Sequence, residues 1–86
     1  MASYRIEVSA TAEKQIRKLT ARDQVRVLRA IQHLGFDPHP LGCRKLQGYD
    51  DVFRIRVGSY RVIYSVESGR LIVIILKVGH RRDVYR

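Results

Sequence analysis

The segment VFRIRVGSYRVIY, residues 52 to 64, carries the clearest structural pattern in this chain. Apolar residues alternate with arginines from position 53 to position 57, which is the two-residue period of a half-buried strand. Gly58 and Ser59 follow, and glycine at the first central position of a two-residue loop favours a type II′ turn. The segment is therefore expected to form a hairpin of two antiparallel strands.

The turn determines which residues of the two strands face each other. Opposed residues share a face, so Ile55 is expected across from Val62 on one face and Arg56 across from Arg61 on the other. Arg54 falls on the same face as the two opposed arginines. Like charges directly opposed on a sheet are destabilising by up to roughly 1 kcal/mol per pair, so the three arginines predict a bound anion. The alternative is a solvated basic face.

The composition describes a small and strongly basic domain. A chain of 86 residues makes one domain, residues 1–86, with no room for a deep cofactor cavity, so no cofactor is expected. The net charge of +9 favours a polyanionic partner, because neutralising phosphates releases counterions. Nucleic acid is the first candidate, and a membrane surface is less favoured because the basic residues lie on strands as well as helices.

Signals for targeting and for metal binding are not found in the sequence. No apolar run reaches the ~18 residues of a transmembrane helix, and the first ten residues lack the apolar stretch of a signal peptide. We therefore expect a cytoplasmic protein without a membrane partner. Cys43 is the single cysteine, so it predicts neither an internal disulfide nor a metal site.

The first part of the chain predicts a strand and two helices. Residues 4–8 alternate apolar and charged side chains, as a strand does. Ser9 or Thr11 can cap a first helix, and Thr20 can cap a second that ends at Gly35. Helical spacing predicts the buried stripes, which are Ala12, Ile16 and Leu19 in the first helix and Val27, Ala30, Ile31 and Leu34 in the second. We expect the helices to form a hairpin.

The exposed sides of both helices are expected to be basic. Their candidate RNA-binding residues are Lys14, Lys18, Arg22 and Arg26. Solvated charge that binds nothing is the alternative interpretation.

The second half of the chain predicts a loop and then a central strand. Residues 37–51 contain several Gly and Pro residues and are expected to be a loop. The apolar run at 71–78 is typical of a strand buried on both faces. A two-residue turn at 68–69 would place Tyr64 across from Val73 on the core side.

The face that carries the arginines is expected to be half apolar. Its apolar members are Ile63, Ile72, Ile74 and Leu76, and an apolar patch of this kind suggests a protein partner. His80 would join this face by strict alternation, but a bulge at Gly79 would reverse the alternation.

The order of these elements and three short segments resemble the RelE/ParE toxin superfamily, in particular its RelE branch of ribosome-dependent messenger RNA interferases. The segments are Leu46-Gln47-Gly48, FRIRVGSYRVIY (53–64) and VGHRRDVY (78–85), and the resemblance covers nearly the whole chain. It implies an α+β fold with the order β-α-α-β-β-β, in which a four-stranded, mostly antiparallel sheet carries the two-helix hairpin on one face.

The resemblance also implies an activity and its partners. RelE-type toxins cleave messenger RNA on the ribosome, without a metal, by attack of a ribose 2′-hydroxyl that leaves a 2′,3′-cyclic phosphate. A type II toxin of this kind is bound by a RelB-like antitoxin in a hetero-oligomer, here through an acidic amphipathic segment on the half-apolar arginine face. Two alternatives are a ParE-like inhibitor of DNA gyrase and a basic RNA-binding module without catalysis.

The family pattern assigns roles to three residues. Arg61 would hold the scissile phosphate, and Arg81 would stabilise the transition state or protonate the leaving oxygen. Tyr85 would stack on or orient a nucleotide. Together these residues favour the RNase over the gyrase inhibitor.

At one point the sequence departs from the family pattern. Arg54 and Arg56 stand where family members often carry lysines credited with phosphate binding and base catalysis. An arginine stays protonated at neutral pH and is a poor general base. The base is therefore another group, such as His80 or Tyr85, or attack is assisted mainly by electrostatics.

Overall fold

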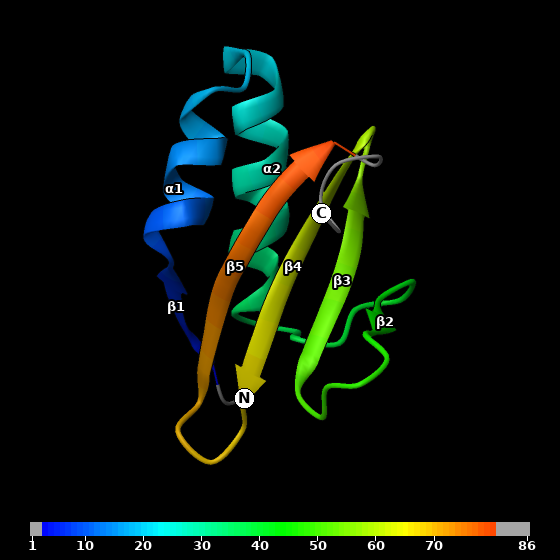
Figure 1. The fold of residues 1–86 in the computed structure, drawn as a ribbon. Helices are drawn as coiled ribbons and strands as arrows, with labels where there is room; N and C mark the ends of the chain where they lie inside the picture. Colours follow the sequence, from blue (N-terminus) through cyan, green and yellow to red (C-terminus); the bar gives the residue numbers. More distant parts are fainter. Residues whose placement is uncertain (1–2, 81–86) are drawn as a thin grey trace.

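The computed structural model describes residues 3–80, which form two helices and five strands. Their order is β1 (Arg5–Val8), α1 (Ala10–Arg17), α2 (Ala21–Leu34), β2 (Arg44–Lys45), β3 (Val52–Val57), β4 (Tyr60–Glu67) and β5 (Ile72–His80). Both helices cover the same face of the sheet, and the view in Figure 1 looks onto the other, open face. Neither helix is long and apolar enough to cross a membrane.

The five strands form one sheet in the order β1-β5-β4-β3-β2. β1 runs parallel to β5, and the other neighbours are antiparallel. The predicted α+β class and the placement of both helices on one face of the sheet are confirmed.

The predicted count of four strands is one too low. Residues 37–51 were expected to be a loop, but Arg44 and Lys45 pair with Arg54 and Phe53 as the short strand β2. The Leu46 amide extends this contact by donating to the Val52 carbonyl at 2.8 Å. Both residues of β2 are exposed, so it has no buried face and leaves no alternating pattern in the sequence.

The hairpin of β3 and β4 has the register that the sequence predicts. Arg56 lies across from Arg61, and Ile55 lies across from Val62. Gly58 has a φ of 60°, and Ser59 does not have a positive φ, as a type II′ turn requires. Glycine therefore occupies the one turn position whose positive φ other residues rarely adopt.

The turn between β4 and β5 is longer than predicted. Four residues, 68–71, connect Glu67 to Ile72, and Leu71 adopts a positive φ of 55°. Tyr64 therefore lies across from Ile75 instead of Val73. The observed pairing is shifted from the predicted one by two residues, from Val73 to Ile75. Because an even shift does not exchange the faces of a strand, every side chain between the turn and Tyr64 keeps its predicted face.

One further register shift lies in the middle of the β4–β5 pair. Tyr64 pairs with Ile75, but its neighbour Ile63 pairs with Lys77, so β5 contains one extra residue, Leu76, as in a β-bulge. Beyond this point Tyr60 pairs with His80. The sequence predicted that a bulge at Gly79 would move His80 off the arginine face. His80 does lie on the other face, but the bulge that moves it is at Leu76, three residues earlier, where no glycine is present.

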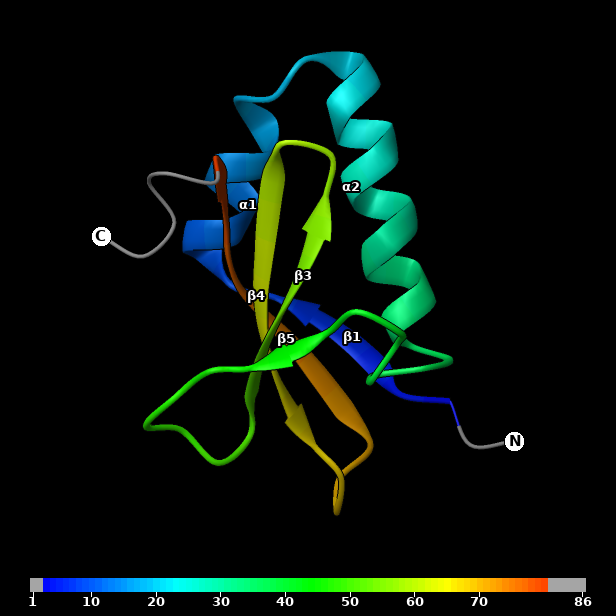
Figure 2. The same cartoon turned by 90° about the vertical axis from the view of Figure 1, so that its right-hand side faces the viewer.

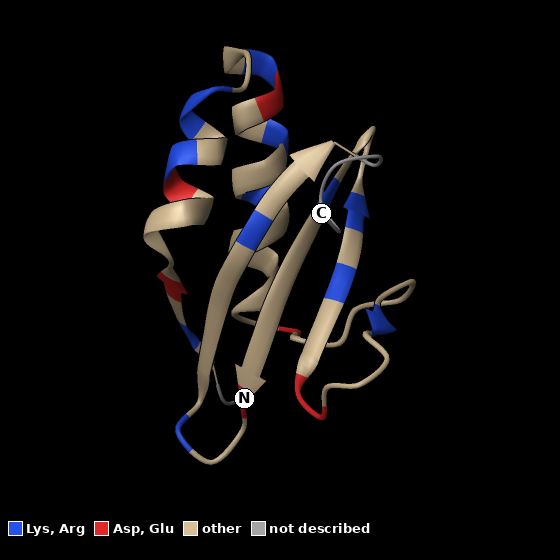
Figure 3. Cartoon of the chain, viewed as in Figure 1, with Lys and Arg blue, Asp and Glu red and all other residues tan. Residues whose placement is uncertain are grey.

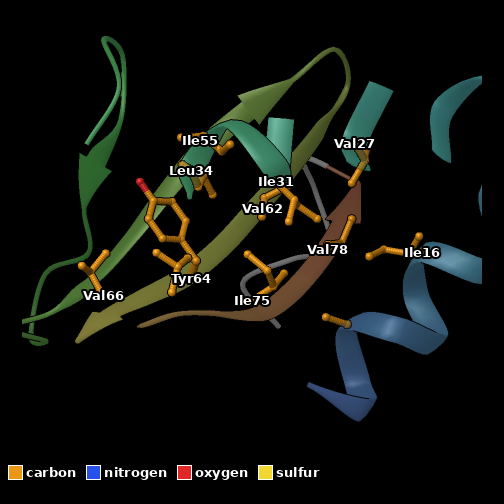
Figure 4. Packing of buried hydrophobic residues seen from close by; sticks show 12 residues of the cluster. Ile16, Val27, Ile31, Leu34, Ile55, Val62, Tyr64, Val66, Ile75 and Val78 are labelled. Carbon is orange, nitrogen blue, oxygen red and sulfur yellow. The ribbon is translucent and has the colours of Figure 1, made fainter. Parts of the chain in front are cut away.

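The core lies between the two helices and the three long strands, as Figure 4 shows. Val27, Ile31 and Leu34 of α2 are at most 3% exposed. Tyr64, fully buried in β4, donates a 2.8 Å hydrogen bond to the Pro38 carbonyl and so ties the loop after α2 to the sheet. Burial raises the pKa of the Tyr64 hydroxyl above its ordinary value.

Two side-chain caps fix where the helices begin. The Ser9 Oγ accepts a hydrogen bond from the Ala12 amide at 3.1 Å, and the Thr20 Oγ1 accepts one from the Asp23 amide at 3.2 Å. Such caps satisfy backbone donors that have no partner inside the helix. Both sites were predicted, with Ser9 and not Thr11 as the first cap.

Replacing Phe53 by alanine should lower the free energy of unfolding by about 3 kcal/mol, as expected for an aromatic ring that packs against the core. Phe53 contacts the ring of His39 at a centroid distance of 4.7 Å and that of Tyr64 at 5.9 Å. Urea unfolding followed by circular dichroism measures the change. A loss below about 1 kcal/mol would mean that this ring does not support the core.

Candidate anion-binding site

Two arginines face each other on the open side of the hairpin. Arg56 is exposed and Arg61 is half-buried, and they lie directly across the β3–β4 pair. A hollow of about 50 Å³ lies between them and the turn residues Gly58 and Ser59. Since a water molecule takes up about 30 Å³ in the liquid, the hollow suits a single small group, such as the oxygens of one phosphate.

The chemistry of the hollow favours an anion. Two guanidinium groups at opposed positions repel each other, and an anion between them converts that repulsion into two attractions. Guanidinium groups present planar sets of donors that match phosphate oxygens. Arg54, half-buried on the same face two positions before Arg56, adds a third cation.

The structure also places two cations on this face, outside the lining of the hollow, that the sequence did not predict. Arg44 lies across from Arg54 because β2 pairs there, and Lys77 lies across from Ile63. Figure 3 shows basic residues on β2, β3, β4 and β5. No sequence pattern marks β2, and the position of Lys77 depends on a register shift that has no sequence signal either.

Helix α2 holds the tip of the hairpin. The Tyr60 hydroxyl donates a 3.0 Å hydrogen bond to the Asp23 carboxylate, which raises the pKa of Tyr60, and burial acts in the same direction. Arg26 packs on the turn so closely that a Cβ at Gly58 would lie 2.8 Å from its guanidinium. The first turns of α2 therefore brace the strand ends that carry Arg56 and Arg61.

The predicted RNA-binding residues of the helices are brought to the site unequally. Arg26 reaches the hairpin turn, whereas Lys14, Lys18 and Arg22 are exposed on the helices, on the other side of the sheet from the opposed arginines. Figures 1 and 2 place the α1–α2 connection and the β3–β4 turn at the same end of the molecule. These residues therefore enlarge the basic end without lining the hollow.

His80 is not brought to the open face. Its partner across the strands is Tyr60, on the helix side of the sheet, and the two rings meet edge to face at 6.0 Å. Arg61 instead lies across from Gly79. The register shift at Ile63 and Tyr64 is the physical cause, since it exchanges the faces of all later residues of β5. The remaining predicted residues, Arg81 and Tyr85, lie outside the described residues.

The apolar half of the open face is smaller than predicted. Ile63 and Ile72 are only 6% and 4% exposed, and Ile74 and Leu76 are half-buried. What remains is a groove of about 370 Å³, lined by Leu46, Gln47, Tyr49, Val52, Ile63, Leu76 and Lys77. The segment before β3 thus forms one wall, although the sequence predicts only a loop there.

Metal-binding and thiol chemistry add nothing to this description. Among residues 3–80, no three His, Cys, Asp or Glu side chains gather in a group that could hold a metal ion. Cys43 is a half-buried free thiol in the segment before β2.

Comparisons with protein families and with single proteins both find similarity to toxins. Residues 6–85 match the family model described as "ParE toxin of type II toxin-antitoxin system, parDE". The chain is 31% identical over 84 residues to Toxin RelG of Mycobacterium tuberculosis, which covers 96% of this chain and 97% of that protein.

Solved structures show the same likeness in three dimensions. The toxin in the RelE–RelB complex of Pyrococcus horikoshii superimposes with a TM-score of 0.83 at 31% identity, covering 95% of this chain and 99% of that one. The RelBE2 toxin–antitoxin complex of M. tuberculosis gives a TM-score of 0.83 at 28% identity, covering 96% and 97%.

The hydrogen bond between Tyr60 and Asp23 predicts a pH dependence of stability. A raised pKa means that the folded protein keeps the phenol proton at pH values where the unfolded chain loses it, so stability falls as the pH rises above about 10. The difference in unfolding free energy between wild type and Tyr60→Phe should be constant from pH 7 to 9 and shrink above pH 10. Urea titrations at each pH measure it, and a gap that stays constant at high pH would contradict the assignment.

Proposed function

The chain belongs to the RelE/ParE superfamily of toxins from type II toxin–antitoxin systems, and on this premise we propose that it is a ribosome-dependent endoribonuclease that cuts messenger RNA. The opposed pair of Arg56 and Arg61 on the open face carries the proposal. A phosphodiester that becomes a more negative phosphorane during cleavage is the kind of group that two fixed guanidinium groups stabilise.

The proposed reaction is an internal transfer at phosphorus. The ribose 2′-oxygen forms a bond to the adjacent phosphorus, and the bond from phosphorus to the 5′-oxygen of the next nucleotide breaks. The products are a 2′,3′-cyclic phosphate and a 5′-hydroxyl, and one proton leaves the attacking oxygen while another reaches the leaving oxygen. Arg61 holds the scissile phosphate, and Arg54 and Arg56 stabilise its growing charge.

Arg81 and Tyr85 complete the proposed site. On the family pattern we assign Arg81 to the same phosphate, as transition-state stabiliser or as proton donor to the leaving oxygen. Because the arginines stay protonated and His80 lies on the helix side, we propose that attack is assisted mainly by electrostatics, with the 2′-hydroxyl proton passing to solvent, and we assign Tyr85 to orient the nucleotide.

The proposed partners follow from the open face. The ribosome, with its messenger and ribosomal RNA, supplies the polyanion that the net charge of +9 favours. The solved relatives of P. horikoshii and M. tuberculosis are complexes with antitoxins, so we propose a RelB-like antitoxin here. Its acidic amphipathic segment would bind the apolar groove and the neighbouring arginines, giving a hetero-oligomer in the cytoplasm.

A second candidate function is inhibition of DNA gyrase. The matching family model favours this function, because the description of that model names the ParE toxin. The basic hairpin supports the RNase instead, because a protein that only inhibits gyrase does not require cations placed to stabilise a reacting phosphate. A basic RNA-binding module without catalysis would also use these cations, so a direct test of cleavage is needed.

Induction of the chain in growing cells should produce messenger RNA ends that are phased with codons inside translated regions. Arg61→Ala should abolish both the ends and the growth arrest, while Arg70→Ala, at a distant turn where Arg70 pairs with Glu67 at 3.1 Å, should keep both. Sequencing of RNA 5′ ends measures the outcome. Intact messages with DNA damage would indicate gyrase inhibition, and full activity of Arg61→Ala would contradict the proposed site.

A further inference from the structure

A second and larger cleft lies at the outer edge of β3. It has a volume of about 760 Å³ and is bounded by α2, by the segment before β2, by β2 and by β3. Figure 2 shows these four parts of the chain around the outer edge of β3. Its lining residues are Ala30, His33, Pro40, Leu41, Gly42, Arg44, Lys45, Arg54, Ile55 and Arg56.

The charges of this edge cleft are all of one sign. Four of its ten lining residues are Arg or Lys, and none is Asp or Glu. A concave surface lined by a single sign of charge concentrates the field and attracts counterions of the opposite sign. The ligand that fits this surface is therefore a flexible polyanion.

The edge cleft is continuous with the proposed cleavage site. Arg54 and Arg56 belong to both, since they lie on the open face of β3 by register and also line the cleft. Arg26 continues the cationic surface at the far end, where it packs on the turn at Gly58. A chain bound at the opposed arginines would thus meet further cations as it passes round the edge of β3.

We propose that the edge cleft binds the phosphate backbone of the RNA strand next to the scissile nucleotide, an inference that rests on the proposed function. A single strand can bend round one β-strand within a few nucleotides, whereas a duplex is stiff over many base pairs. The volume is in the range of pockets that hold drug-sized ligands, which is about the size of one or two nucleotides. Arg44 and Lys45 are the cleft residues that act on RNA without belonging to the cleavage site.

The test compares two double variants with the same loss of charge. Arg44→Gln with Lys45→Gln removes the two exposed cations of β2, and Arg5→Gln with Arg70→Gln removes two exposed cations on β1 and the β4–β5 turn. Each protein is titrated with 2′-O-methyl RNA, which cannot be cleaved, as a trinucleotide and as a decanucleotide. Binding is measured over a range of salt concentrations.

We expect the cleft variant to bind the decanucleotide more weakly, with the slope of log affinity against log salt reduced by about 1.4, which is about 0.7 for each of two lost phosphate contacts. Its affinity for the trinucleotide should stay within about twofold of wild type, because a short RNA occupies only the opposed arginines. The control variant should behave as wild type with both RNAs.

Equal decanucleotide slopes for the cleft and control variants would overturn the proposal. So would a cleft variant that loses affinity for an acidic antitoxin peptide but not for RNA, because the cleft would then be a protein-binding site. Arg61→Gln separates this inference from the proposed function: unchanged trinucleotide binding in that variant counts against the cleavage site, whereas the comparison of slopes concerns the cleft alone.

Discussion

The register of β3 on β4, which places Arg56 across from Arg61, is the constraint on which the arrangement of the open face depends. The two residues are opposed because a glycine at position 58 permits a two-residue turn, and that turn fixes the register of β3 on β4. The tip is then held by α2, through the hydrogen bond from Tyr60 to Asp23. The turn and the hydrogen bond from Tyr60 to Asp23 together hold two cations at opposed positions, and this arrangement is suited to a ligand of opposite charge.

One face of the sheet packs against the helices and stabilises the fold, and the other face is available for binding. On one face, side chains of β3, β4 and β5 pack against α2, and Tyr64 reaches across to the Pro38 carbonyl. This core supports the sheet without help from the open face. The open face and the outer edge of β3 are therefore free to carry cations, and the basic residues of β2, β3, β4 and β5 lie where they do not have to be buried.

Local patterns in the sequence predicted the hairpin, the helix caps and the buried stripes, because each depends on neighbours in the chain. Three features were missed because no local pattern announces them. β2 is two exposed residues that pair only because the chain returns to β3, the four-residue turn requires Leu71 at a positive φ, and the shift at Leu76 has no glycine to mark it. The pairing of β2 decides that Arg44 lies on the open face, and the shift at Leu76 decides that Lys77 lies there and that His80 does not.

Urea unfolding of Arg56→Gln at low ionic strength, next to cleavage of messenger RNA on programmed ribosomes, tests whether the opposed charges exist for the sake of a phosphate. Removing one charge should raise the free energy of unfolding by up to about 1 kcal/mol, because the repulsion is relieved, and should lower the cleavage rate. A variant that is less stable than wild type, or one that cleaves at the full rate, would contradict the role given to this pair.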